Sequence, residues 1–123
     1  MNHQELADGF YRVAQVLNSS AMKPDEEDYK KRVVFARLYY AAYHKCLHHD
    51  VNLQKSTESN KHYTLKQKMV NQDDTLRRVY LSLYHLRFWA DYQIQDSNSP
   101  EFTKLTSYIY ETGKILKRAT IPL

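Results

Sequence analysis

The segment KPDEEDYKKRVVFARLYYAAYHKCLHHDV, residues 23–51, decides the fold of this chain. Pro24 suits the first position of a helix, and the acidic residues at 25–27 complement the positive end of the helix dipole. Behind them, apolar side chains recur at helical spacing on one face, which predicts a stripe that faces a core. This stripe consists of Val34, Phe35, Leu38, Ala41 and Ala42. The segment therefore predicts one long helix over about residues 25–49.

Two shorter helical patterns lie on either side of this segment. Apolar residues from Leu6 to Leu17 recur at helical spacing and predict a first helix, which turn formers end at 18–20. After a polar stretch at 50–61 that predicts a loop, HYTLKQKMV at 62–70 offers a brief helical turn.

Two more helices are predicted in the second half. The pattern from Asn71 continues to about Ile94 and predicts a third long helix. Ser99 as N-cap, with Pro100 at the first position, predicts a last helix. Its apolar stripe consists of Phe102, Leu105, Ile109, Thr112 and Leu116.

The composition supports an all-α fold. The chain has 123 residues, of which only 2 are Gly and 3 are Pro, too few for a turn-rich β protein. Four principal helices with short connections predict an up-and-down bundle of four to five helices. We expect a single domain over residues 1–123.

Charge and hydropathy narrow the class of protein. The net charge of +4 and pI of about 9.1 permit a polyanionic partner without demanding one. The mean hydropathy is −0.73, and charges interrupt every apolar run, so no membrane span is expected. One cysteine, Cys46, cannot form an internal disulfide, and the N-terminal residues lack a signal pattern, which predicts a cytoplasmic protein.

LYHLRFWADYQ, residues 83–93, contains the first candidate site. On a helical wheel Arg87 falls inside the apolar stripe, with Asp91 one turn later at its edge. A guanidinium cannot shed its charge, so its burial must be matched by a carboxylate or several acceptors. Trp89 and Tyr92 fall on the opposite side, which is also apolar. A helix that is apolar on both sides is either central or shared with a second subunit, and we favour a homodimer.

Other readings of these residues stay open. Arg87 and Asp91 also have the spacing of an ordinary ion pair within a helix. His44 shares a flank with Arg37 and Tyr40, where a histidine satisfied by neighbouring tyrosines competes with a proton-transfer group. No histidine or cysteine spacing suits a metal, and no glycine-rich phosphate loop is present, so neither a metal nor a cofactor is expected.

Three segments together resemble the HEPN superfamily of small helical bundles. They are RLYYAAYHKCL at 37–47, HYTLKQKM at 62–69 and LYHLRFWADYQ at 83–93, and the likeness spans roughly residues 25–118. The resemblance implies a bundle that dimerises, with a cleft at the dimer interface. Many members are metal-independent endoribonucleases of bacterial defence or toxin–antitoxin modules.

The resemblance also implies roles for individual residues. Arg87 stands at the position of the family's arginine, which stabilises the phosphate charge, and Tyr92 stands where the family has a histidine. The implied catalytic residues are therefore Arg87, Asp91, His44 and Tyr92, and the implied RNA or nucleotide contacts are Arg87, Arg37 and Tyr40. The second function left open is a non-catalytic dimeric module that binds a nucleotide or partners a nucleotidyltransferase antitoxin.

Overall fold

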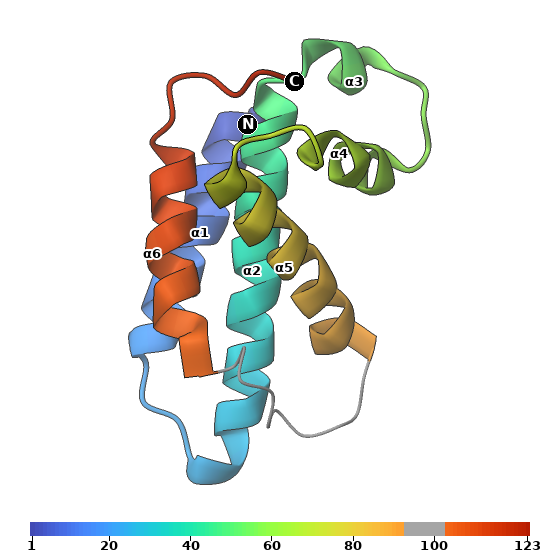
Figure 1. Cartoon of the computed structure of the whole chain (residues 1–123). Helices are drawn as coiled ribbons and strands as arrows, with labels where there is room; N and C mark the ends of the chain where they lie inside the picture. The colour runs from blue at the N-terminus through green and yellow to red at the C-terminus, as the bar shows by residue number, and fades with distance from the viewer. Residues whose placement is uncertain (93–102) are drawn as a thin grey trace.

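A computed structural model describes residues 1–92 and 103–123, with the side chain of Tyr92 outside the described set. Within these residues every regular element is helical (Figure 1). A 3₁₀ turn, Pro24–Glu26, precedes the longest helix. The α-helices are α1 His3–Ser19, α2 Glu27–His48, α3 Val51–Lys55, α4 Lys61–Met69, α5 Asp74–Tyr92 and α6 Leu105–Leu116.

Helix starts are set by short polar side chains. Asn2 accepts a hydrogen bond from the backbone N–H of Glu5 and caps α1. Asn60 caps α4 through the N–H of Tyr63, and Asp73 accepts from the N–H of Leu76 in the first turn of α5. Each side chain satisfies an N–H that the helix itself leaves without a partner.

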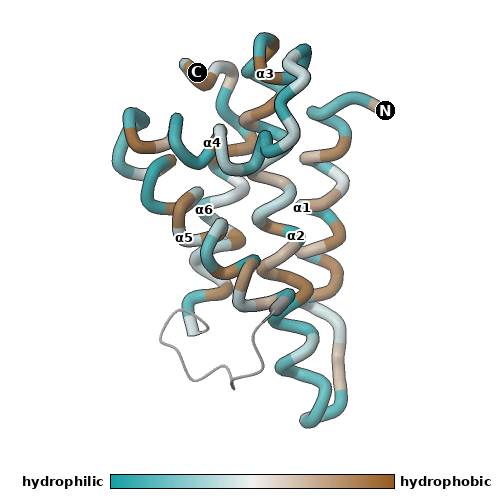
Figure 2. The backbone as a smooth tube through the Cα atoms, turned by 90° about the vertical axis from the view of Figure 1, so that its right-hand side faces the viewer, coloured by the Kyte–Doolittle hydropathy of each residue, from teal (hydrophilic) through white to brown (hydrophobic). Residues whose placement is uncertain are grey.

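Helix α2 is the centre of the molecule, because it contacts α1, α3, α4, α5 and α6. Figure 2 shows α1 and α2 side by side over most of their length, with hydrophobic positions on both. The predicted core stripe of α2 is buried throughout. On its flank, Phe10 of α1 packs against Tyr40 and His44, whereas Val33 stays 41% exposed.

Three predictions need correction or fall outside the described residues. The prediction of a loop over 50–61 is wrong at Val51–Lys55, which form the five-residue helix α3. Asp50 caps this helix by accepting a hydrogen bond from the N–H of Leu53. Trp89, expected at a dimer contact, is buried at 9% exposure, and the Arg32 guanidinium lies 4.0 Å from its ring centre. The predicted cap at Ser99 and Pro100 lies outside the described residues.

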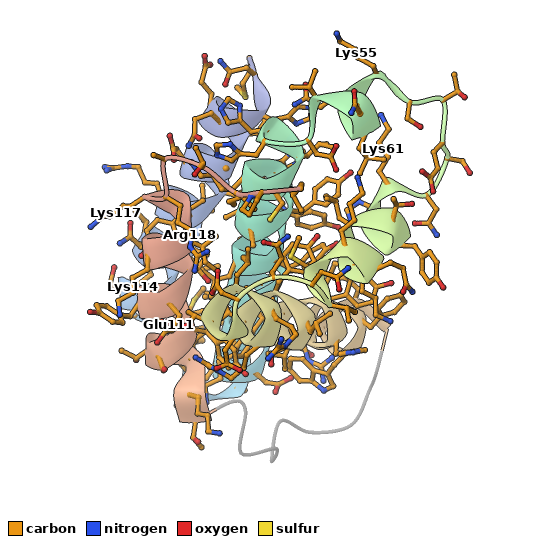
Figure 3. All side chains as sticks on the ribbon, turned by 45° about the horizontal axis from the view of Figure 1, so that its top comes forward. Lys55, Lys61, Glu111, Lys114, Lys117 and Arg118 are labelled. Carbon is orange, nitrogen blue, oxygen red and sulfur yellow. The ribbon has the colours of Figure 1, made fainter. Side chains whose placement is uncertain are left out.

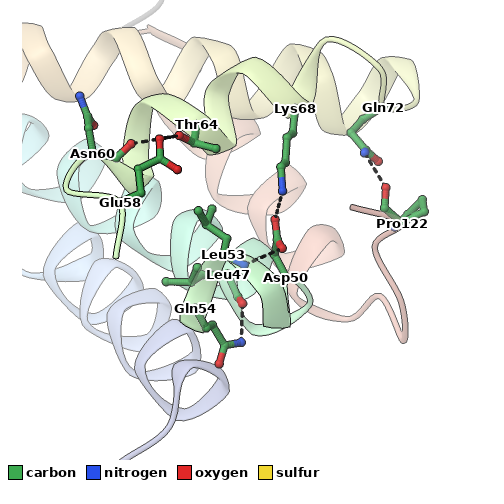
Figure 4. Close-up of polar contacts among 10 residues, drawn as sticks. All are labelled: Leu47, Asp50, Leu53, Gln54, Glu58, Asn60, Thr64, Lys68, Gln72 and Pro122. Carbon is green, nitrogen blue, oxygen red and sulfur yellow. Dashed lines mark hydrogen bonds and ion pairs between the residues drawn. The ribbon is translucent and has the colours of Figure 1, made fainter. Parts of the chain in front are cut away.

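Polar contacts fix α3 and α4 against the end of α2 (Figure 4). The ammonium of Lys68 on α4 lies 2.6 Å from the buried carboxylate of Asp50. The Gln54 amide donates to the carbonyl of Leu47 at 2.6 Å, and that of Gln72 donates to the carbonyl of Pro122 at 2.9 Å. Of these links, the Lys68–Asp50 pair holds α4 near the end of α2.

Two further features of the structure concern the single cysteine and the length of the helices. Cys46 is fully buried in the core, and burial raises the pKa of its thiol to about 12. None of the described helices combines the length and the apolar character that crossing a membrane requires.

Candidate functional site

Arg87 is a largely covered charged residue whose partners match its charge poorly. Its side chain is only 15% exposed, yet the nearest carboxylate oxygen, on Asp91, is 4.0 Å away. One guanidinium N–H donates to the Tyr40 hydroxyl over a long 3.4 Å, and Nε is buried with no hydrogen-bond partner. Asp91 therefore compensates the charge only partly, since a good charge-assisted hydrogen bond is about 2.7–2.9 Å long.

Aromatic rings take up much of the space around this guanidinium. Its carbon lies 5.3 Å from the ring centre of Tyr39, 5.9 Å from that of Tyr40 and 5.0 Å from that of Phe88. Ring faces attract a cation, but they do not replace hydrogen-bond acceptors. Arg87 thus retains donor capacity that an anion could use.

A cavity of about 240 Å³ opens beside Arg87, between α2 and α5. Three of its lining residues, Arg37, Tyr40 and Asp91, were predicted as site residues, and two of them also lie next to Arg87. The remaining lining residues are Arg32, Val33, Ala36 and Ala90. Arg37 also stands over the ring of Phe10, with 5.5 Å between its guanidinium carbon and the ring centre. The cavity therefore has two arginines, a phenol and a carboxylate on its walls.

His62, which the sequence did not single out, lies at the same tyrosines as Arg87. Its Nδ1 is 2.7 Å from the Tyr39 hydroxyl, and its ring stacks on Tyr43 with 3.8 Å between centres. The rings of Tyr39 and Tyr40 lie 5.7 and 6.2 Å from it. Arg87 and His62 therefore share Tyr39 and Tyr40 as neighbours, although α5 and α4 supply them separately.

The environment of His62 suits a proton acceptor. Burial lowers its pKa below the ordinary value of 6.5, and the charge of Arg87 lowers it further. The contact between Nδ1 and the Tyr39 hydroxyl fits either tautomer. The tautomer that serves as a base has its proton on Nδ1, donates to Tyr39 and keeps the Nε2 lone pair. Burial raises the pKa of Tyr39 well above that of a free phenol, so Tyr39 remains a neutral partner that holds the imidazole.

His44, the histidine that the sequence favoured, is occupied elsewhere. Its Nδ1 lies 2.9 Å from Nδ1 of His3, and its ring stacks on Phe10. Burial, followed by the charges of His3 and His62, lowers its pKa to about 4. His44 touches Tyr43, which in turn touches His62, so it belongs to the same aromatic group without contacting Arg87.

The structure thus brings together Arg87, Tyr40, Asp91 and Arg37, and it sets His44 apart behind Tyr43. The side chain of Tyr92 lies outside the described residues. The sequence offered only one signal for His62, its place in the segment HYTLKQKM, because its proximity to Arg87 depends on how α4 packs across α2. No group of three or more histidine, cysteine, aspartate or glutamate side chains suited to a metal occurs among the described residues.

Comparison with known proteins gives no further assignment: no family model, curated protein or solved structure matches this chain.

Proposed function

We propose that this chain is a HEPN-like cytoplasmic protein of a bacterial defence or toxin–antitoxin module, which binds RNA and cleaves it without a metal ion. The observation that carries the proposal is the incompletely compensated guanidinium of Arg87, beside a cavity whose wall includes Arg37. A buried cation with unused donors is a ready partner for a phosphate. The resemblance of three sequence segments to the HEPN superfamily supports the choice of RNA.

In the proposed reaction Arg87 binds the scissile phosphate and neutralises charge that develops on its oxygens. His62 accepts the proton of the adjacent ribose 2′-hydroxyl through Nε2. The 2′-oxygen forms a new bond to phosphorus as the bond from phosphorus to the 5′-oxygen breaks, and water protonates the leaving oxygen. The products are a 2′,3′-cyclic phosphate and a 5′-hydroxyl, and no oxidant, reductant or metal ion takes part.

Incubation of the purified protein with mixed RNA in EDTA tests the proposal. We expect fragments with 2′,3′-cyclic phosphate ends from the wild type and cleavage slower by at least about 10²-fold from Arg87→Ala. Arg78→Ala is the matched control, because Arg78 is an exposed arginine on the same helix. Intact RNA at high protein concentration, or equal cleavage by the Arg87→Ala variant, would contradict the proposal.

The proposal includes a homodimer. Val33 on α2 and Phe88 on α5 are each 41% exposed, and both lie beside Arg87 or its cavity. A dimer formed through this surface would bring the two cavities to one interface. Sedimentation of Val33→Glu/Phe88→Glu should then report a monomer, whereas Val13→Glu/Val16→Glu, which changes two exposed valines of α1, should remain dimeric. A monomeric wild type would refute the dimer.

A further inference from the structure

A second cavity, distinct from the Arg87 site, lies between α1 and α6. Its volume is about 400 Å³, within the range of small-molecule sites, and it shares no lining residue with the cavity between α2 and α5. Its walls consist of Asp8, Tyr11, Arg12, Gln15, Tyr110, Gly113, Lys114, Leu116 and Lys117. Figure 3 shows Lys114 and Lys117 on the same side of α6, pointing away from the body of the bundle.

The charge in this cavity is unbalanced. Arg12, Lys114 and Lys117 contribute three cations, and none of them forms an ion pair with a described residue. Asp8 contributes the one carboxylate among the lining residues, and it already accepts a hydrogen bond from Gln4 at 3.0 Å. Three positive side chains from two helices line one open cavity, and they favour a ligand with more than one negative charge.

Two tyrosines give the cavity an aromatic wall beside its positive charge. Tyr110 is 62% exposed, and the ammonium of Lys114 lies 4.5 Å from its ring centre. Tyr11 is fixed, because its hydroxyl donates to the carbonyl of Ile109 at 2.9 Å. The cavity therefore has an exposed aromatic ring in contact with a cation. Proteins that bind single-stranded nucleic acids use these two features for base stacking and phosphate contact.

A glycine lets the two walls of this cavity approach each other closely. A Cβ atom at Gly113 would lie 2.5 Å from the Tyr11 hydroxyl, so a side chain at that position would displace Tyr11 or separate the helices. The absence of a side chain at this point allows α6 to approach the Tyr11 ring closely.

We propose that the cavity between α1 and α6 binds a nucleoside phosphate unit, with its base on Tyr110 and its phosphates on Arg12, Lys114 and Lys117. The unit is either a free nucleotide or a segment of single-stranded RNA, since both present the same chemistry. This site is independent of the proposed cleavage at Arg87, and it stands even if no cleavage occurs.

Binding of a fluorescein-labelled oligoadenylate of about 12 nucleotides tests the site, because single-strand sites span about 4–16 nucleotides. The measurement is fluorescence anisotropy in the Arg37→Ala/Arg87→Ala background, which removes two of the cations proposed to bind phosphate at the α2–α5 cavity. Lys114→Glu/Lys117→Glu should weaken binding at least about tenfold and lower the salt slope by about 1.4, the value for two phosphate contacts on a single strand. Lys23→Glu/Lys55→Glu, exposed lysines that do not line the cavity, changes the net charge equally and should cost less than about threefold.

Tyr110→Ala tests the base contact, with Tyr29→Ala as control because Tyr29 is similarly exposed on α2. We expect Tyr110→Ala to weaken oligoadenylate binding and Tyr29→Ala to leave it unchanged. Competition then separates the sources: displacement by ADP identifies a free nucleotide, and displacement by unlabelled oligoadenylate alone identifies RNA. Three results would each overturn the proposal: equal losses in both double variants, equal effects of the two tyrosine variants, or displacement by pyrophosphate as effective as that by ADP.

Discussion

Arg118 and Arg87 have opposite surroundings, although both side chains are largely covered. Arg118 donates two hydrogen bonds to the carboxylate of Asp73, at 2.6 and 3.0 Å, which is a bidentate pair. Arg87 has a phenol at 3.4 Å, a carboxylate at 4.0 Å and a buried Nε without a partner. A guanidinium that its own chain satisfies joins two parts of the fold, whereas one left partly unsatisfied is able to accept a ligand.

The largest expected difference between the two arginines is in RNA cleavage. Arg87→Ala should lower the cleavage rate about 10²- to 10³-fold, the usual cost of removing one group that stabilises developing charge. Arg118→Ala should stay within about twofold of the wild type at a temperature where both are folded. Single-turnover cleavage of a labelled RNA measures this, and a similar loss in both variants would mean that the effect is one of folding.

His62→Gln should lower cleavage about 10²-fold, at the lower end of the range for general acid–base catalysis. Because the pKa of His62 lies below 6.5, the wild-type rate should fall as the pH drops through that pKa, while the variant's residual rate should not follow this titration. His44→Gln is the control, since His44 does not contact Arg87. If the pH dependence disappears in His44→Gln and remains in His62→Gln, then His44 accepts the proton and the role proposed for His62 is wrong.

Substitution of the two arginines by methionine should change the free energy of unfolding differently. Arg87→Met removes a poorly compensated buried charge and should leave the free energy of unfolding unchanged or raise it by about 1 kcal/mol. Arg118→Met breaks a partly exposed pair and should lower it by about 0.5–1 kcal/mol. Urea denaturation monitored by circular dichroism measures both. If Arg87→Met proves the more destabilising, Arg87 serves mainly to hold α5 in place.

The remaining effects concern the pH dependence of stability. The pKa of His44 is lowered from 6.5 to about 4, so the unfolded chain binds the proton more readily and stability should fall between about pH 6.5 and pH 4. The pKa of Asp73 is lowered by Arg118 and by the N–H of Leu76, so its contribution should persist above pH 3.8 and be lost in stronger acid. Urea denaturation at a series of pH values measures both effects. His44→Asn should remove the pH dependence of the free energy of unfolding between about pH 6.5 and 4, and Asp73→Asn should remove the dependence below about pH 3.8.

The helices were largely predictable, whereas the neighbours of the candidate site were not. Periodicity located α1, α2, α4 and most of α5, because each buries a stripe that recurs every three or four residues. It missed α3, which has five residues and depends on the Asp50 cap and on packing against α2. The wheel placed Arg87 in the apolar stripe, but it could not show whether Asp91 comes within hydrogen-bonding range.

Long-range contacts explain the misplaced histidine. His62 reaches Tyr39 only because α4 lies across α2, and the Nδ1 of His44 is taken by His3, 41 residues away in sequence. Neither contact has a local signature. The homodimer was inferred from apolar residues on both sides of α5, a pattern that the burial of Trp89 within one chain accounts for in part.

Gly113 gives the experimenter a way to adjust one cavity without touching the other. Because a methyl group there would meet the Tyr11 hydroxyl, Gly113→Ala acts as a wedge between α1 and α6. Nothing that surrounds Arg87 or His62 would be altered directly. A substitution at this glycine can therefore change ligand binding at the α1–α6 cavity while leaving the residues around Arg87 in place.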